Sequence, residues 1–95
     1  MNIGQAISEI RKKKGITQKE LAKECGLSVT AIVNIEKGKC FPSKTSISSI
    51  CQSLGVAVSV LMVYSITEED VPEDRRDSFR VIIEPIKAYL TDAQF

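Results

Sequence analysis

The sequence predicts an all-α fold, and three observations support that prediction. The first 66 residues divide into five short segments, most of which open on a capping residue and stop at a glycine. Apolar residues within these segments recur three or four positions apart, which is the spacing of one helix face. No segment before residue 67 alternates apolar and polar residues between hairpin turns, as antiparallel strands do. At 95 residues, the chain has the length of one small domain.

The first segment, "NIGQAISEIRKKKG", is predicted to be an amphipathic helix. Asn2 is a good capping residue, and Gln5 follows three positions later as in a capping box. A basic last turn suits the negative end of the helix dipole, and Gly15 stops the helix. Its inward stripe consists of Ile3, Ile7 and Ile10.

The second and third segments are two short helices joined by a tight turn. Thr17 caps the second segment with Glu20 as its capping-box partner, and Gly26 ends it. Ser28 caps the third segment and Gly38 ends it. The residues expected to face inward are Leu21, Ala22, Cys25, Ile32 and Ile35.

The fourth and fifth segments complete the predicted domain. Ser43 caps the fourth and Gly55 stops it. Its inward residues are Ile47, Ile50, Cys51 and Leu54. The fifth helix is predicted at about residues 58–66, and it has more apolar residues than a helix with one buried face needs. Apolar surface of that extent usually marks an interface.

The segment after residue 67 allows two interpretations. Acidic residues and Pro72 favour a helix start, and a helical stripe follows. That stripe consists of Phe79, Ile82, Ile83, Ile86 and Leu90. Pro85 predicts a kink or a break in such a helix. Alternation of apolar residues in "SFRVIIEP" instead fits a strand, and we favour the helix.

Charge is distributed unevenly along the chain. Residues 1–44 hold nine Lys or Arg and four Asp or Glu, net +5, whereas residues 45–67 carry no charge. Residues 68–95 hold four basic and eight acidic residues, net −4. Only the front of the chain therefore suits a polyanion, although an uneven solvated surface would give the same pattern.

Several function classes are disfavoured by what the sequence lacks. It has three cysteines without a C-x-x-C pattern and no histidine, so we expect no metal site, no cofactor and no enzymatic nucleophile. Free thiols and the absence of an h-region near the start favour the cytoplasm. Residues 45–67 are uncharged and long enough to span a bilayer, but nine are Ser, Thr or Gln, so we expect no membrane span.

Sequence motifs in and around the two-helix unit resemble those of a known family. The matching pieces are "R-x-x-x-G-I-T-Q-x-x-L-A", "G-L-S-x-x-x-I-x-x-I-E-x-G-K" and "P-S-x-x-x-I-x-x-I-C-x-S-L-G-V". Residues 3–63 thereby resemble the Xre family of helix-turn-helix regulators, relatives of the phage lambda repressor. The resemblance implies a five-helix lambda repressor-like domain. Residues 67–95 add a C-terminal helical extension, in which the kink or break is expected at Pro85.

The resemblance also implies how the chain would hold double-stranded DNA. The helix at 28–37 would enter the major groove, with bases contacted by Val29, Thr30, Val33 and Asn34. Phosphates would be contacted by Thr17, Gln18, Lys37, Lys39, Ser43 and Lys44. Gln18 is also placed against the recognition helix by the resemblance. An ion pair between Arg11 and Glu36 would fix the angle of that helix.

The face of the third segment that the resemblance assigns to base contacts has few side chains that can hydrogen-bond to bases. Asn34 can pair with adenine and Thr30 can donate or accept, but valine can only meet a thymine methyl group or fill space. Readout that is weak, A·T-leaning or dependent on DNA shape would follow. A protein-binding role for this face is the alternative.

We expect two functional parts: residues 1–66 as the DNA-binding domain, and the acidic extension 67–95 as a dimerisation or core-capping element. Residues expected at a dimer interface are Val60, Val63, Tyr64, Phe79, Ile82, Ile83 and Ile86. The function that follows is a homodimeric regulator, expected to act as a repressor on a palindromic operator. The alternative is an antitoxin or adaptor-type module whose extension, or valine-bearing third helix, binds a protein partner.

Overall fold

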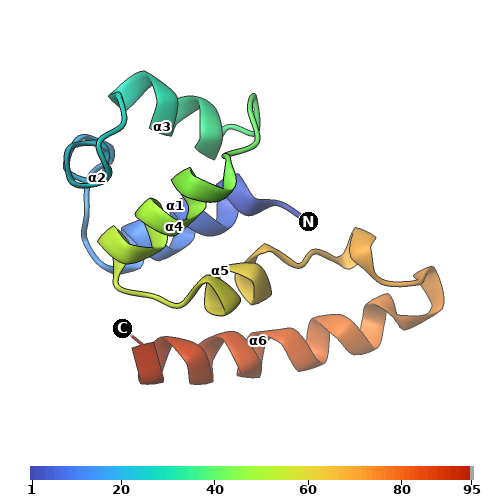
Figure 1. Cartoon of the computed structure of the whole chain (residues 1–95). Helices are drawn as coiled ribbons and strands as arrows, with labels where there is room; N and C mark the ends of the chain where they lie inside the picture. The colour runs from blue at the N-terminus through green and yellow to red at the C-terminus, as the bar shows by residue number, and fades with distance from the viewer. Residues whose placement is uncertain (95) are drawn as a thin grey trace.

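The computed structural model describes residues 1–94, and all regular structure in that range is helical (Figure 1). The all-α prediction is confirmed. The five helices expected in the first part are α1 (Ile3–Lys13), α2 (Gln18–Cys25), α3 (Val29–Glu36), α4 (Lys44–Leu54) and α5 (Val58–Ser65). The single-turn 3₁₀ helices η1 (Glu68–Asp70) and η2 (Glu73–Arg75) then lead into the long α6 (Arg76–Gln94).

One hydrophobic core joins the first five helices. α1 packs against both α3 and α5, and α2 packs against α3 and α4. Each helix contributes its inward stripe, and the larger side chains at the centre are fully enclosed: Ile7, Ile10, Leu21, Ile32, Ile50, Leu54 and Leu61. Cys25 and Ile47, expected to be inward, are only partly buried at the edge of this core.

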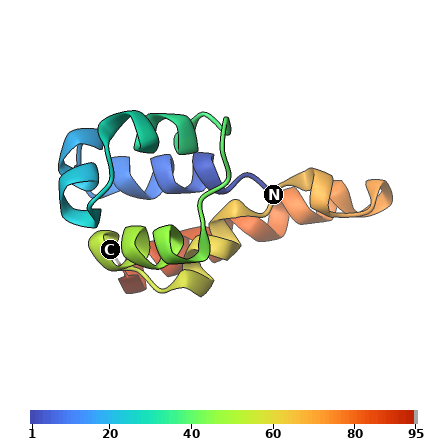
Figure 2. The ribbon, with the colours of Figure 1, turned by 45° about the horizontal axis from the view of Figure 1, so that its top comes forward.

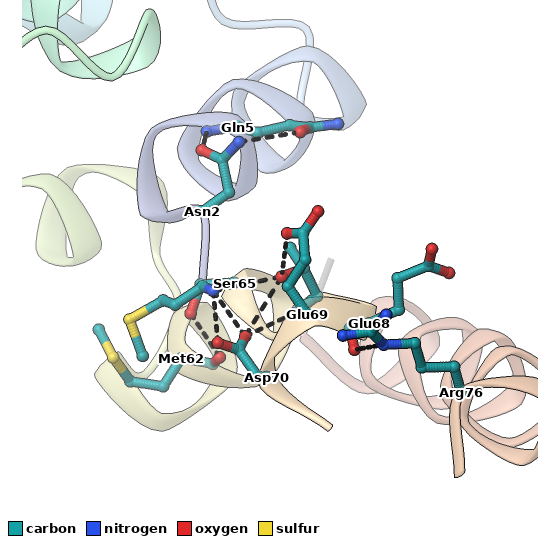
Figure 3. A network of polar contacts seen from close by, with 10 residues as sticks. Asn2, Gln5, Met62, Ser65, Glu68, Glu69, Asp70 and Arg76 are labelled. Carbon is teal, nitrogen blue, oxygen red and sulfur yellow. Dashed lines mark hydrogen bonds and ion pairs between the residues drawn. The ribbon is translucent and has the colours of Figure 1, made fainter. Parts of the chain in front are cut away.

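The linker between α5 and α6 is tied to the start of α1 (Figure 3). The backbone N–H of Asn2 donates to the carbonyl of Ser65 at 2.7 Å, and the Ser65 hydroxyl donates to the carbonyl of Met62 at 2.6 Å. Asp70 accepts hydrogen bonds from the terminal amine of Met1 and from the backbone N–H of Thr67. These contacts stabilise the turn that sends α6 back along the domain.

α6 runs along the side of the domain opposite α3, beside α5 (Figures 1 and 2). The strand interpretation of residues 78–85 is therefore wrong, and α6 continues through Pro85 rather than ending there. A proline removes one backbone hydrogen bond to the carbonyl four residues earlier, here that of Val81. Pro85 and Val81 are both exposed, so water can satisfy that carbonyl.

No single helix among residues 1–94 has the length and apolar composition needed to cross a membrane. The pair α4 and α5 meets those two criteria only when taken together, and the two helices are bent by 102° at their junction.

Candidate nucleic-acid interface

Local sequence signals position the α2–turn–α3 unit. The Thr17 hydroxyl accepts from the backbone N–H of Glu20, and the Glu20 carboxylate accepts from the N–H of Thr17. Gly26 closes α2 in the left-handed region with φ of 72°, a conformation that costs other residues energy. Ser28 then caps α3 by accepting from the N–H of Ala31. The chain therefore leaves one helix and starts the next within a few residues.

α3 has one buried and one accessible face. Ile32 and Ile35 lie in the core, whereas Val29 and Thr30 are exposed at the start of the helix. Val33 and Asn34, the other two residues expected to face bases, are partly buried. Within residues 1–94, the side chains of Thr30 and Asn34 make no hydrogen bond. Their polar groups are consequently available to a ligand.

A buried ion pair holds the end of α3. Arg11 Nε donates to Glu36 Oε2 at 2.7 Å, and Nη2 donates to Oε1 at 3.1 Å. Arg11 Nη1 donates to the carbonyl of Ile16 at 2.9 Å, and Gln18 Nε2 donates to Glu36 Oε1 at 3.0 Å. The Glu36 carboxylate thereby connects α1, the start of α2 and the end of α3. Arg11 and Glu36 are the two residues for which the resemblance implied an ion pair.

A close backbone contact, which sequence reasoning missed, fixes the other end of α1 against α3. A Cβ built on Gly4 would lie 2.1 Å from the carbonyl oxygen of Ile35 and 2.9 Å from that of Glu36. The two helices can meet this closely only because residue 4 has no side chain. A glycine inside a helix is unfavourable by about 1 kcal/mol relative to alanine, and that oddity was the available signal.

Some of the residues expected to contact phosphate are exposed, whereas others already form hydrogen bonds within the chain. Lys37, Lys39 and Lys44 are exposed around the α3–α4 turn. The hydroxyls of Thr17 and Ser43 cap their helices, with Ser43 accepting from the N–H of Ser46 at 3.1 Å. Lys37, Lys39, Ser43 and Lys44 thus follow the end of α3, and Gln18 contacts its last residue, Glu36.

The residues expected at a dimer interface divide into two groups. Val60, Tyr64 and Ile83 are buried within the single chain. Ile82 and Ile86 are exposed on α6, and Val63 and Phe79 are partly buried.

Tyr64, a member of the first group, anchors α6 on its own domain. Its hydroxyl donates to the Lys87 carbonyl at 3.2 Å and hydrogen-bonds the Thr91 hydroxyl. The Lys87 ammonium lies 5.3 Å from the centre of the Tyr64 ring and 3.8 Å from the Glu9 carboxylate. The extension therefore covers part of the core of its own chain.

Within the described residues, no three side chains of the ligand types His, Cys, Asp or Glu converge in a way that could hold a metal ion.

Comparisons with known proteins agree with this geometry. Residues 7–61 match a family model described as helix-turn-helix (HTH_3). The chain is 34% identical over 62 residues to the immunity repressor protein of Bacillus phage phi105, covering 65% of this chain and 43% of that protein. It is 35% identical over 72 residues to the ImmF control region 10 kDa protein of the same phage, covering 76% and 77%. The match thus spans less than half of the repressor's length.

Two further similarities lie outside that phage. An uncharacterized HTH-type transcriptional regulator of Archaeoglobus fulgidus is 38% identical over 58 residues, covering 61% of this chain and 83% of that protein. Among solved structures, the clp gene regulator ClgR from C. glutamicum superimposes with a TM-score of 0.66 at 28% identity. That superposition covers 67% of this chain and 83% of ClgR.

Proposed function

Since this chain belongs to the Xre-like helix-turn-helix family of DNA-binding transcription regulators, we propose that it is a sequence-specific repressor that binds a palindromic operator as a homodimer. It would act in the cytoplasm, without cofactor or catalysis. The name of the phage immunity repressor supports the choice of repressor over activator.

The observation that carries the proposal is the way α3 is mounted. Its first turn is exposed, while its last turn is held both by the hydrogen bonds to the Glu36 carboxylate and by the close Gly4 contact. A helix fixed in this way can enter the major groove without losing further conformational freedom. Thr30 and Asn34 would read base edges, and Val29 and Val33 would contact thymine methyl groups or fill space.

Phosphate contacts would fix the register of α3 on the duplex. Lys37, Lys39 and Lys44 supply exposed ammonium groups close to α3. The starts of α2 and α4, at Thr17, Gln18 and Ser43, add backbone N–H groups that favour an anion. Such contacts dominate affinity and its dependence on salt but carry no sequence information.

Selection from random duplex DNA at near-physiological salt tests this proposal. Enrichment of a palindrome with half-sites about one helical turn apart is expected. The double variant Thr30→Ala, Asn34→Ala should lose the motif and keep the salt dependence, whereas the control Gln52→Ala, Ser59→Ala should change neither. If no motif is enriched and binding is weak and purely salt-driven, the proposal is wrong.

A further inference from the structure

α6 carries a second apolar stripe besides the side that packs on its own domain. The stripe consists of Phe79, Ile82, Ile86 and Tyr89, spaced three, four and three residues apart. Ile82, Ile86 and Tyr89 are 57%, 41% and 74% exposed, and Phe79 is partly buried. Alternating spacings of three and four place apolar residues along one seam, as at the a and d positions of a coiled coil.

The stripe points neither toward the domain core nor directly away from it. Ile83 and Leu90 mark the side of α6 that contacts the core, and Lys87, bonded through its carbonyl to Tyr64, lies on the same side. At 3.6 residues per turn, the centre of the stripe lies about a quarter turn around the helix from these three residues. Another helix can therefore lie beside α6 without displacing its own domain.

Charged side chains of α6 lie off the stripe. Between residues 77 and 87 they are Asp77, Arg80, Glu84 and Lys87, all away from the stripe by the same projection. Arg80 is paired with Glu68 and Asp77, and Lys87 with Glu9. A helix docked on the stripe would consequently avoid burying these charges, a penalty that weakens many interfaces.

A hollow at the start of the stripe can receive a large side chain from a partner. It has a volume of about 260 Å³ and is lined by Val71, Arg75, Ser78, Phe79 and Ile82. A cavity of about 150 Å³ already accepts benzene, so a tyrosine ring fits here.

The spacing of the stripe is symmetric, which allows it to pair with the same stripe on a second copy. The midpoint between Phe79 and Tyr89 is residue 84, which is also the midpoint between Ile82 and Ile86. A two-fold axis at that point would place Tyr89 of one copy against Phe79 and the hollow of the other, and Ile82 against Ile86. Isologous interfaces have this reciprocal form, in which one surface patch meets its own copy.

We propose that a second copy of this chain docks on the stripe, with the two α6 helices antiparallel around residue 84. The inference rests on the homodimer of the proposed function and names the surface that forms it. α3 and α6 lie on opposite sides of the domain (Figure 1). A two-fold axis running from the helix pair toward the domains leaves both α3 helices on the same side, as binding to one duplex requires.

Sedimentation equilibrium with a matched pair of variants tests the surface. Ile82→Glu should raise the dimer dissociation constant by at least about tenfold, because central buried anchors dominate an interface. Val81→Glu is the control, since Val81 is 74% exposed on another face of the same helix. Tyr89→Ala provides a second variant that adds no charge. Equal dimerisation of all three variants and the parent chain overturns the proposal.

Cross-linking tests the direction of the helices. In a Cys40→Ser background, the double variant Phe79→Cys, Tyr89→Cys should give a covalent dimer with a short bismaleimide at protein concentrations above the dimer dissociation constant of that variant. Phe79→Cys alone should not, because the two new thiols at position 79 would be offset by about 15 Å along the helix axis, given the rise of about 1.5 Å per residue. Efficient cross-linking of the single variant would mean a parallel pair and would overturn the proposal.

The two proposals fail in different ways. If the chain selects a palindrome but Ile82→Glu leaves its dimer dissociation constant unchanged, the dimer interface lies elsewhere. The repressor proposal then stands, and the α6 interface is rejected. If the chain dimerises through α6 but enriches no DNA motif, the α6 interface stands and the repressor proposal is rejected. A chain that remains monomeric at the concentrations where it binds DNA overturns the α6 pair.

Discussion

The guanidinium of Arg11 and the carboxylate of Glu36 form a two-bond ion pair with their side chains only 10% and 6% exposed. Such a pair is costly to bury, but the Ile16 carbonyl and the Gln18 amide supply further hydrogen bonds to it. It joins α1 to the end of α3, so the stability of the domain and the placement of α3 depend on the same contact.

Replacing Glu36 by Ala should lower the free energy of unfolding by about 3–5 kcal/mol, because the Arg11 charge would remain buried without its partner. Urea denaturation followed by circular dichroism measures this. The double variant Arg11→Met, Glu36→Leu should recover a large part of the loss, since no charge is then buried. A loss below about 1 kcal/mol in Glu36→Ala would mean that the pair is solvated and does not position α3.

Gly4→Ala should destabilise the protein, although the same change in an ordinary helix interior is stabilising by about 1 kcal/mol. The new Cβ would lie 2.1 Å from a backbone oxygen of α3, and backbone cannot move aside as a side chain can. We expect a loss of roughly 1–3 kcal/mol, typical of overpacking, and weaker operator binding because α3 shifts. Thermal denaturation that shows a higher Tm for Gly4→Ala would contradict this account.

Lys39→Gln and Lys44→Gln should each reduce the slope of log K against log salt by about two, because the homodimer carries each lysine twice and each lysine neutralises about one phosphate. Base preference should not change. Lys13→Gln is the matched control, since Lys13 lines a cavity with Glu84 and Lys87 on the α6 side of the domain. Equal slopes for all three variants would remove the α3–α4 turn from the interface.

Signals carried by neighbouring residues were sufficient to predict the helices. Thr17 with Glu20, and Ser28, mark helix starts through contacts within three residues, so the sequence alone reveals them. The docking of α6 was not predictable in this way. It depends on the contact between Tyr64 and Thr91, which are 27 residues apart, and many other pairings of apolar residues were equally compatible with the sequence.

The candidate site was predictable only as far as residue type and position on a helix determine a role. The resemblance indicated the Arg11–Glu36 pair, but the third contact to Glu36, from Gln18, and the approach of α1 to α3 at Gly4 are products of packing. The expected dimer residues illustrate the same limit. Helical spacing grouped Ile82 with Ile83, yet adjacent positions on α6 differ by about 100°, and only Ile83 is buried by its own chain.

The contact between Glu68 and Arg80 should be visible in a pH titration. A hydrogen bond from Arg80, together with its charge, holds the pKa of the Glu68 carboxyl below its ordinary value. The contact therefore contributes fully above about pH 4.3, the unfolded pKa, and is lost as pH falls through the lower folded pKa. Carboxyl chemical shifts measured by NMR should show that low pKa, and Arg80→Gln should raise it. An unchanged pKa in the variant would mean that the contact does not persist in solution.

Alkylation rates of the three thiols should follow their burial, which increases from exposed Cys40 through partly buried Cys25 to Cys51 in the core. Burial raises the pKa of the Cys51 and Cys25 thiols, which lowers the fraction of reactive thiolate near neutral pH. Iodoacetamide should therefore modify Cys40 first and Cys51 last, with clearly separated rates that mass spectrometry of the digested protein can measure. In concentrated urea the three rates should converge, because unfolding removes the burial that separates them. Rapid modification of Cys51 in the native protein would mean that the core formed by α1 to α5 opens far more readily than its packing implies.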